Sequence, residues 1–335
     1  MSTNKKLRIE YVFSLLFAFF LLLGCSGKKV YNETSSELQI VRFDTDLYQY
    51  LTSGKSKNIL EIHKPFLDEF GKNVIYIGNV DSAGFYDRLK AYFSEPALKG
   101  LYKDTQEEFK DLTAINNELS YGIKTLTQHF PSLSPPKLYM HVSGFNQNVI
   151  VTGDVLSISV DKYLGADYPL YQSFFYEYQR QLMSKDRIVP DYLLGFLIAN
   201  FPFKGNASIL LDRILYEGKL RYILSLLMPD RQTWEYVGYS QEQYTWCSDN
   251  QARIWELILE NKHLFPSDYR TTEQYIRNAP HTAFLSAESP GRVGVWLGFQ
   301  IINSYMKNHS DSSIQELMDM VDYQELLKQS KYKPR

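Results

Sequence analysis

Apolar residues recur at three- and four-residue spacing over most of the chain, a pattern typical of helices that pack on a core. The expected helices cover residues 59–70, 85–93, 101–130, 171–183, 189–201, 207–227, 240–264, 272–278, 291–306 and 313–329. Three short runs rich in strand-forming residues lie at 138–142, 149–152 and 156–160, separated by turn residues. We therefore predict an α+β fold, mostly α-helical, with one small antiparallel β-sheet.

The first 24 residues follow a different pattern. Three basic residues among the first ten precede an almost wholly apolar run at 11–23, which is shorter than the ~20 residues that span a bilayer as a helix. The run ends in Leu22, Leu23, Gly24 and Cys25. This is the lipobox pattern of bacterial lipoproteins, in which the cysteine thiol receives a diacylglyceryl group and the bond before it is cut.

We therefore predict a lipoprotein signal peptide at residues 1–24 and lipidation of Cys25. The alternatives are an uncleaved signal anchor, or an ordinary secretory signal with a chance cysteine. The polar residues that follow are typical of a tether, so we expect a lipidated N-terminus and tether at 25–39 and a single mostly helical domain at 40–335. No second apolar run approaches spanning length.

Charge and cysteine content narrow the function. The chain has 36 basic and 38 acidic residues, and the basic ones form no stripe or tail. Nucleic-acid binding needs clustered Lys and Arg, so we expect no nucleic-acid partner. Cys247 is the only cysteine besides Cys25, which leaves no intramolecular disulfide. Its aromatic neighbours favour a buried structural thiol over a reactive one.

The sequence offers little catalytic chemistry. It has no His-Glu-x-x-His, no Gly-x-Ser-x-Gly and no phosphate-binding glycine loop. We therefore predict no catalytic residue, no bound metal and no cofactor. The six histidines have no helical ligand spacing; they are His63, His129, His141, His263, His281 and His309.

Glu217 is the most unusual polar residue, because it lies within an otherwise apolar helical stretch. A buried carboxylate needs a partner. It is either a metal ligand or general base, or one half of an ion pair with Arg213, Arg253 or Arg292. We favour the ion pair and treat Glu217 and Arg292 as a possible degenerate site or structural ion pair.

A second feature is the segment 291–298, in which Trp296 is flanked by small residues. Such a segment favours tight helix–helix packing over a ligand pocket.

Several segments together resemble the gliding-motility lipoproteins of the GldB type, found in Bacteroidetes. The resemblance runs from about Ile40 to Lys307, and the lipobox agrees with it. Its segments are 41–48, 161–165, 168–171, 214–222, 238–247, 250–255 and 289–298. The resemblance implies a cell-envelope lipoprotein that, in gliding species, is required for surface motility and is tied to protein export. Members also occur in species that do not glide.

The GldB type is also distantly similar to gluzincin zinc peptidases, which implies a degenerate gluzincin-peptidase-like architecture. Glu217 then falls near the position of the third zinc ligand of those enzymes. The preceding helical stretch, 191–201, has no His and no Glu, so two ligands and the general base are missing. One carboxylate does not hold a zinc-activated water. Gln251 stands where the family pattern is often acidic.

We therefore expect a non-catalytic envelope lipoprotein that binds protein partners in a gliding-motility or associated secretion assembly. Lipid on Cys25 attaches it to the membrane, with the outer membrane facing the periplasm favoured because residues 27–29 lack an acidic surface-export signal. One alternative is a metal-dependent or unusual hydrolase in which Glu217 converges with His141, His263 or His281. Another is a glycan-binding lipoprotein with exposed Tyr and Trp, which buried tryptophans would disfavour; the tryptophans are Trp234, Trp246, Trp255 and Trp296.

Overall fold

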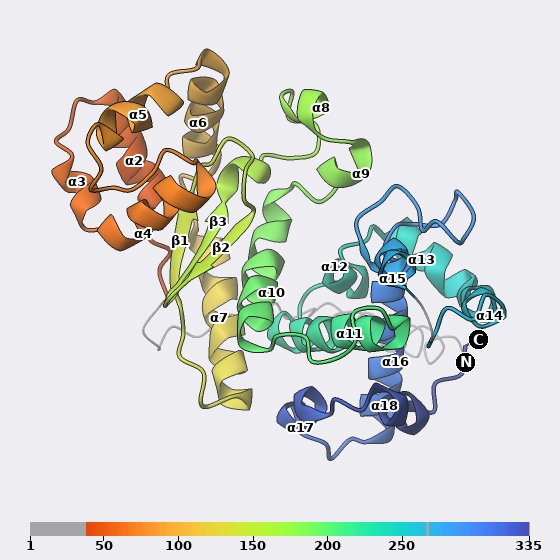
Figure 1. Ribbon diagram of the computed structural model, residues 1–335. Helices are drawn as coiled ribbons and strands as arrows, with labels where there is room; N and C mark the ends of the chain where they lie inside the picture. The colour runs from red at the N-terminus through yellow and green to blue at the C-terminus, as the bar shows by residue number, and fades with distance from the viewer. Residues whose placement is uncertain (1–37, 266–267, 335) are drawn as a thin grey trace, which may run out of the picture. The chain divides into compact units, whose positions relative to one another are not determined.

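The computed structural model describes residues 38–265 and 268–334 (Figure 1). The predicted signal peptide, Cys25 and most of the predicted tether lie outside the described residues. The predicted α+β fold, mostly helical with one small sheet, is confirmed. Among the described residues, no helix is both long enough and apolar enough to cross a bilayer.

Helices precede and follow the sheet. The N-terminal ones are α2 (Phe43–Thr52), α3 (Asn58–Glu61), α4 (Lys64–Glu69), the π-helical turn η1 (Phe70–Val74), α5 (Phe85–Tyr92), α6 (Pro96–Glu108) and α7 (Thr113–His129). After the sheet come η2 (Val160–Lys162), α8 (Tyr171–Phe174), α9 (Glu177–Arg180), η3 (Lys185–Arg187), α10 (Ile188–Asn200) and α11 (Leu210–Leu227). The rest are α12 (Thr233–Val237), α13 (Gln241–Asp249), α14 (Gln251–Glu260), α15 (Tyr269–Ile276), α16 (Val293–Asn308), α17 (Ile314–Asp319) and α18 (Tyr323–Ser330).

Five segments predicted as single helices are pairs of helices. The segments are 59–70, 101–130, 171–183, 240–264 and 313–329. Short-range capping explains two of the breaks: the Asp111 carboxylate accepts from Thr113 N at 2.9 Å, and the Asp322 carboxylate accepts from Glu325 N at 2.9 Å. A side chain that caps a new helix satisfies amide groups that the first helix would otherwise have used. Apolar spacing continues across such a break and does not reveal it.

The sheet consists of β1 (Lys137–His141), β2 (Val149–Thr152) and β3 (Val155–Ser159), in the order β1-β3-β2. β2 and β3 form the predicted antiparallel hairpin, but β1 runs parallel to β3. The prediction of an antiparallel sheet is therefore wrong for β1. β3 lies in the centre, and β2 carries the exposed Val151 and forms an edge, whereas β1 is as buried as β3 and is bridged on its other side by Val41.

Helices lie on either side of the sheet. On one side are the N-terminal helices α2 to α6, and α10 lies beside the strands (Figure 1). Gly195 of α10 allows this close approach, because a Cβ there would lie 2.9 Å from Val149 Cγ1. The chain then turns into α11, which crosses α16.

The crossing of α11 and α16 is built on two glycines. A Cβ on Gly298 would lie 1.7 Å from Ile214 O, and a Cβ on Gly218 would lie 2.3 Å from Gly298 C. Only hydrogen fits at such distances, so the backbones of the two helices touch. Trp296 is 1% exposed. The prediction of tight helix–helix packing around Trp296 is confirmed.

Cys247 is fully buried on α13. Burial raises the pKa of its thiol far above the ordinary value, which keeps it protonated. The prediction of a buried thiol is confirmed.

Candidate binding cleft

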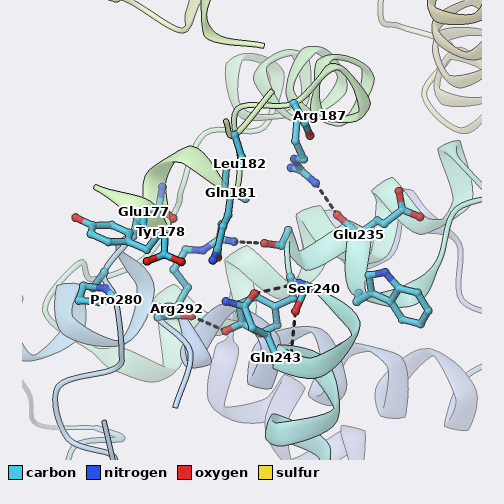
Figure 2. A pocket seen from close by; sticks show the side chains of 18 of the residues that line it. Glu177, Tyr178, Gln181, Leu182, Arg187, Glu235, Ser240, Gln243, Pro280 and Arg292 are labelled. Carbon is cyan, nitrogen blue, oxygen red and sulfur yellow. Dashed lines mark hydrogen bonds between the residues drawn. The ribbon is translucent and has the colours of Figure 1, made fainter. Parts of the chain in front are cut away.

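A cleft of about 1050 Å³ lies among α9, η3, α12, the start of α13 and the chain before α16. Figure 2 shows side chains from these elements around it, including Tyr178, Arg187 and Arg292. Two of the family-like segments, 238–247 and 289–298, supply part of its wall. Tyr176 and Tyr178 form one aromatic edge, with ring centroids 5.8 Å apart and nearly parallel planes.

A recess of about 410 Å³ adjoins the cleft. The two cavities share four lining residues: Leu182, Arg187, Asn278 and Arg292. Lys162, Asp191 and Arg221 also line the recess. Both volumes are in or near the range of about 300–1,000 Å³ that is usual for ligand sites.

Arg292 stands where cleft and recess meet. It precedes the first turn of α16 in the left-handed backbone region, with φ 62°. Its Nη2 donates to Val237 O at 2.8 Å and to Gly238 O at 3.0 Å. A Cβ on Gly238 would lie 2.8 Å from this Nη2, so glycine is needed for the guanidinium to approach. A strained backbone at a cavity wall is typical of functional sites.

The pKa of Arg292 is lowered to about 10, chiefly by burial and also by the charges of Arg221 and Arg187, against Tyr239 and Glu217. The three guanidiniums are therefore close enough to repel one another. At neutral pH Arg292 still keeps its proton.

Arg187 enters from the start of α10. It donates through Nη1 to Glu235 O at 2.7 Å and through Nη2 to the Asp191 carboxylate at 3.0 Å. Its Nε is buried and has no hydrogen-bond partner. The other Asp191 oxygen accepts from the Tyr163 hydroxyl at 2.9 Å, which fixes that carboxylate.

Arg221 is the most buried of the three arginines, with a side chain 7% exposed. Its Nη2 lies 3.3 Å from Glu217 Oε2, and its Nη1 is buried without a partner. Burial lowers the pKa of Arg221, whereas Glu217 raises it. Lys162, on the other side of the recess, donates to Asn146 O at 2.9 Å and to Asn148 Oδ1. Burial also lowers the pKa of Lys162.

The two residues singled out from the sequence take different partners. Glu217 lies between Arg213, at 3.8 Å, and Arg221, at 3.3 Å, one helical turn away on either side. Arg253 instead pairs with carboxylates on its own helix, and Arg292 donates to backbone carbonyls. Glu217 is therefore connected to the recess through Arg221. Sequence reasoning missed Arg221, although a second charge four residues after Glu217 was a visible signal.

No histidine in the part of the chain that the structure describes lines the cleft or the recess. His141 is fully buried on β1, where Nδ1 hydrogen bonds with the Ser157 hydroxyl at 2.7 Å, and burial lowers its pKa to about 3. His263 hydrogen bonds with the Tyr275 hydroxyl at 3.0 Å. Within residues 38–265 and 268–334, no three or more His, Cys, Asp or Glu side chains are grouped so that they could hold a metal ion.

The tryptophans do not form an open platform. Trp296 is buried, and the other three are partly buried against the core; they are Trp234, Trp246 and Trp255. Trp234 also lines the cleft. Gln251 donates to the Tyr332 hydroxyl at 2.8 Å and lies outside the lining of both cavities.

A family model described as the gliding motility protein GldB matches residues 25–334. No curated protein and no solved structure matches the chain. The similarity to gluzincin peptidases stays a prediction.

Proposed function

Since this chain belongs to the family of the gliding motility protein GldB, we propose that it is a lipid-anchored envelope protein that acts by binding protein partners and not by catalysis. Its partners belong to a gliding-motility assembly or to the associated secretion machinery. The lipid on Cys25 holds the domain at the membrane, with the outer membrane facing the periplasm as the preferred location.

The guanidinium-lined recess beside the cleft is the observation that carries this proposal. Arg187, Arg221 and Arg292 present fixed positive charge there, and even the lowered pKa of about 10 for Arg292 keeps it protonated at neutral pH. A group that keeps its proton throughout binds and orients anions but does not serve as a general base. The chemistry of the cleft is therefore that of recognition.

Envelope fractionation and partner capture test the proposal. The full chain is expressed in its native host as wild type and as Cys25→Ala, and the membranes are extracted with a lipid-preserving detergent. We expect wild type to sediment with the outer membrane and to capture motility or secretion components that mass spectrometry identifies. Cys25→Ala should leave the membrane fraction and lose these components.

Two results would overturn the proposal. One is stoichiometric zinc in the purified wild-type protein together with cleavage of a peptide library. The other is full retention of Cys25→Ala at the membrane with unchanged partners, which would show that lipid on Cys25 does not anchor the protein.

A further inference from the structure

The recess contains buried donors that the protein itself leaves without an acceptor. Arg221 Nη1 and Arg187 Nε are both buried without a hydrogen-bond partner, and both side chains line the recess. The Arg221 side chain is only 7% exposed. A charged donor buried without an acceptor costs free energy, so proteins keep such a group where a ligand supplies the acceptor.

The charges around the recess define the ligand. Arg187 pairs with Asp191 at 3.0 Å, and Arg221 pairs with Glu217 at 3.3 Å. Arg292 has only carbonyl acceptors, and Arg221 shares Glu217 with Arg213, which lies 3.8 Å from it, so the guanidiniums outnumber the carboxylates. Guanidinium groups bind planar oxygen anions by paired hydrogen bonds. The recess therefore suits a planar oxygen anion such as a carboxylate.

Lys162 also lines the recess. Burial lowers its pKa, against the charge of Asp161, and burial raises the pKa of Asp161. Asp161 itself accepts from Phe145 N at 2.8 Å and from the Ser159 hydroxyl at 2.5 Å.

The adjoining cleft indicates what carries the carboxylate. It is lined by aromatic rings and amide side chains, among them Tyr178, Gln181, Trp234 and Gln243, and by four carboxylates; these are Glu177, Asp186, Glu235 and Glu242. Rings and amides together suit an extended peptide, which offers apolar side chains and backbone hydrogen-bonding groups. The shared wall at Arg187 and Arg292 lets one ligand occupy both cavities.

We infer that the recess binds a peptide carboxylate, with the peptide chain lying in the cleft beside it. This inference rests on the proposed function, because it specifies how a protein partner is recognised. Arg221 and Arg187 supply the donors, and Arg292 supplies the uncompensated charge.

An NMR titration of the arginine Nε–Hε resonances tests the inference. The lipidated full chain in detergent is titrated with N-acetyl-Phe-Ala-Ala bearing a free carboxylate, with the same peptide as its C-terminal amide, and with inorganic phosphate. We expect the free acid to shift the resonances of Arg187 and Arg221 in a saturable way, and the amide to bind at least about tenfold more weakly, as expected when a charge-assisted contact is lost.

Matched variants separate the anion site from the ion pair of Glu217. Arg213 and Arg221 flank Glu217 on the same helix, but only Arg221 lines the recess. Arg221→Met should weaken binding of the free acid at least about tenfold, whereas Arg213→Met should leave it unchanged. Arg187→Gln provides a second recess variant if Arg221→Met does not fold.

Equal binding of acid and amide, or no binding of either by wild type, would overturn the inference. Tighter binding of phosphate than of the peptide acid would replace it with a phosphate site. In the capture experiment, Arg221→Met with all wild-type partners would also contradict the inference while leaving the proposed function intact.

Discussion

Helix α11 takes part in two regions that are built in opposite ways. Where it crosses α16, Gly218 and Gly298 bring the backbones into contact, and the surrounding residues are apolar and buried. One turn further along the helix, Arg221 enters a recess with a buried, unpartnered Nη1. The crossing leaves a neutral donor unpaired, Trp296 Nε1, whereas the recess keeps an unsatisfied charge. Such a local exception is expected where function sets the residue.

Substitutions at the crossing of α11 and α16 should reduce stability more than substitutions in the recess. Gly298→Val places a branched side chain where a Cβ already lies 1.7 Å from Ile214 O, and no rotamer relieves a clash with backbone. We expect loss of most of the stability of the domain, which for proteins of this kind totals about 5–15 kcal/mol. Urea unfolding followed by circular dichroism measures it.

The matched control is Gly100→Ala in α6, where a Cβ would meet nothing within 4 Å. Alanine favours the helix over glycine by about 1 kcal/mol, so this variant should be neutral or more stable. A folded Gly298→Val with wild-type stability would contradict the account of the crossing.

A third face of α11 carries a buried charge that the protein does satisfy. Lys219 is 1% exposed and donates to Met320 O, and burial lowers its pKa from 10.5 to about 8, although Asp319 raises it. Between pH 8 and 10.5 the unfolded state binds more protons than the folded state, so this residue makes the free energy of unfolding rise with pH.

Lys219→Met should therefore be more stable relative to wild type at pH 7 than at pH 10. One pKa unit corresponds to about 1.4 kcal/mol, so the difference should reach about 2 kcal/mol by pH 10. Urea unfolding at both values measures it, with the exposed Lys328→Met as a control for loss of charge. A constant difference between wild type and Lys219→Met would show that Lys219 is not desolvated.

A substitution in the wall of the recess should cause an intermediate loss of stability. Gly238→Ala adds a Cβ 2.8 Å from Arg292 Nη2 and also forces alanine to φ 70°. Backbone strain of this kind costs about 1–3 kcal/mol. We expect that loss in urea unfolding, together with a displaced Arg292 Nε–Hε resonance.

Gly153→Ala isolates the backbone contribution, because Gly153 has φ 54° but nothing within 4 Å of its Cβ position. It should cost a similar amount of stability and leave the Arg292 resonance unmoved. An equal shift in both variants would mean that Gly238 does not position the guanidinium.

Features that depend on local packing could be predicted from the sequence, whereas features that depend on how distant elements meet could not. Helices, the β2–β3 hairpin and the packing around Trp296 depend on local spacing and residue size, and the sequence displays both. The parallel pairing of β1 with β3 depends on the path of the chain, which leaves β1, forms β2 at the far edge and returns as β3 between them. Local patterns do not contain this information.

The sequence alone identified only part of the region around the recess. Glu217 was notable as a charge in an apolar helical stretch, and Arg292 and Arg213 were among its expected partners. Arg187 and Arg221 come together with Arg292 only because α10, α11 and the start of α16 meet. Residues from three separate elements have no fixed spacing along the chain, so a single sequence does not show that they form one site.

Among the four main variants, Arg221→Met should change stability least. This variant tests most directly whether the recess and the crossing are built differently. Removing one partner of a buried ion pair usually costs about 3–5 kcal/mol. Here we expect a change within about 1 kcal/mol, because the variant also removes a charged donor that is buried without an acceptor. Glu217 keeps Arg213 as a partner, and its side chain is 15% exposed, which limits the cost of losing Arg221.

The unfolding free energy of Arg221→Met should be measured beside that of Arg213→Met, which removes the other partner of the same carboxylate. If Arg221 is kept for recognition, both variants retain stability and only Arg221→Met loses affinity for the peptide acid. If Arg221→Met instead costs more than about 3 kcal/mol, the cost usual for breaking a buried ion pair, and leaves affinity unchanged, the guanidinium serves the fold. The two regions along α11 would then obey the same rule, because a residue that stability requires needs no ligand to explain its unpaired donor.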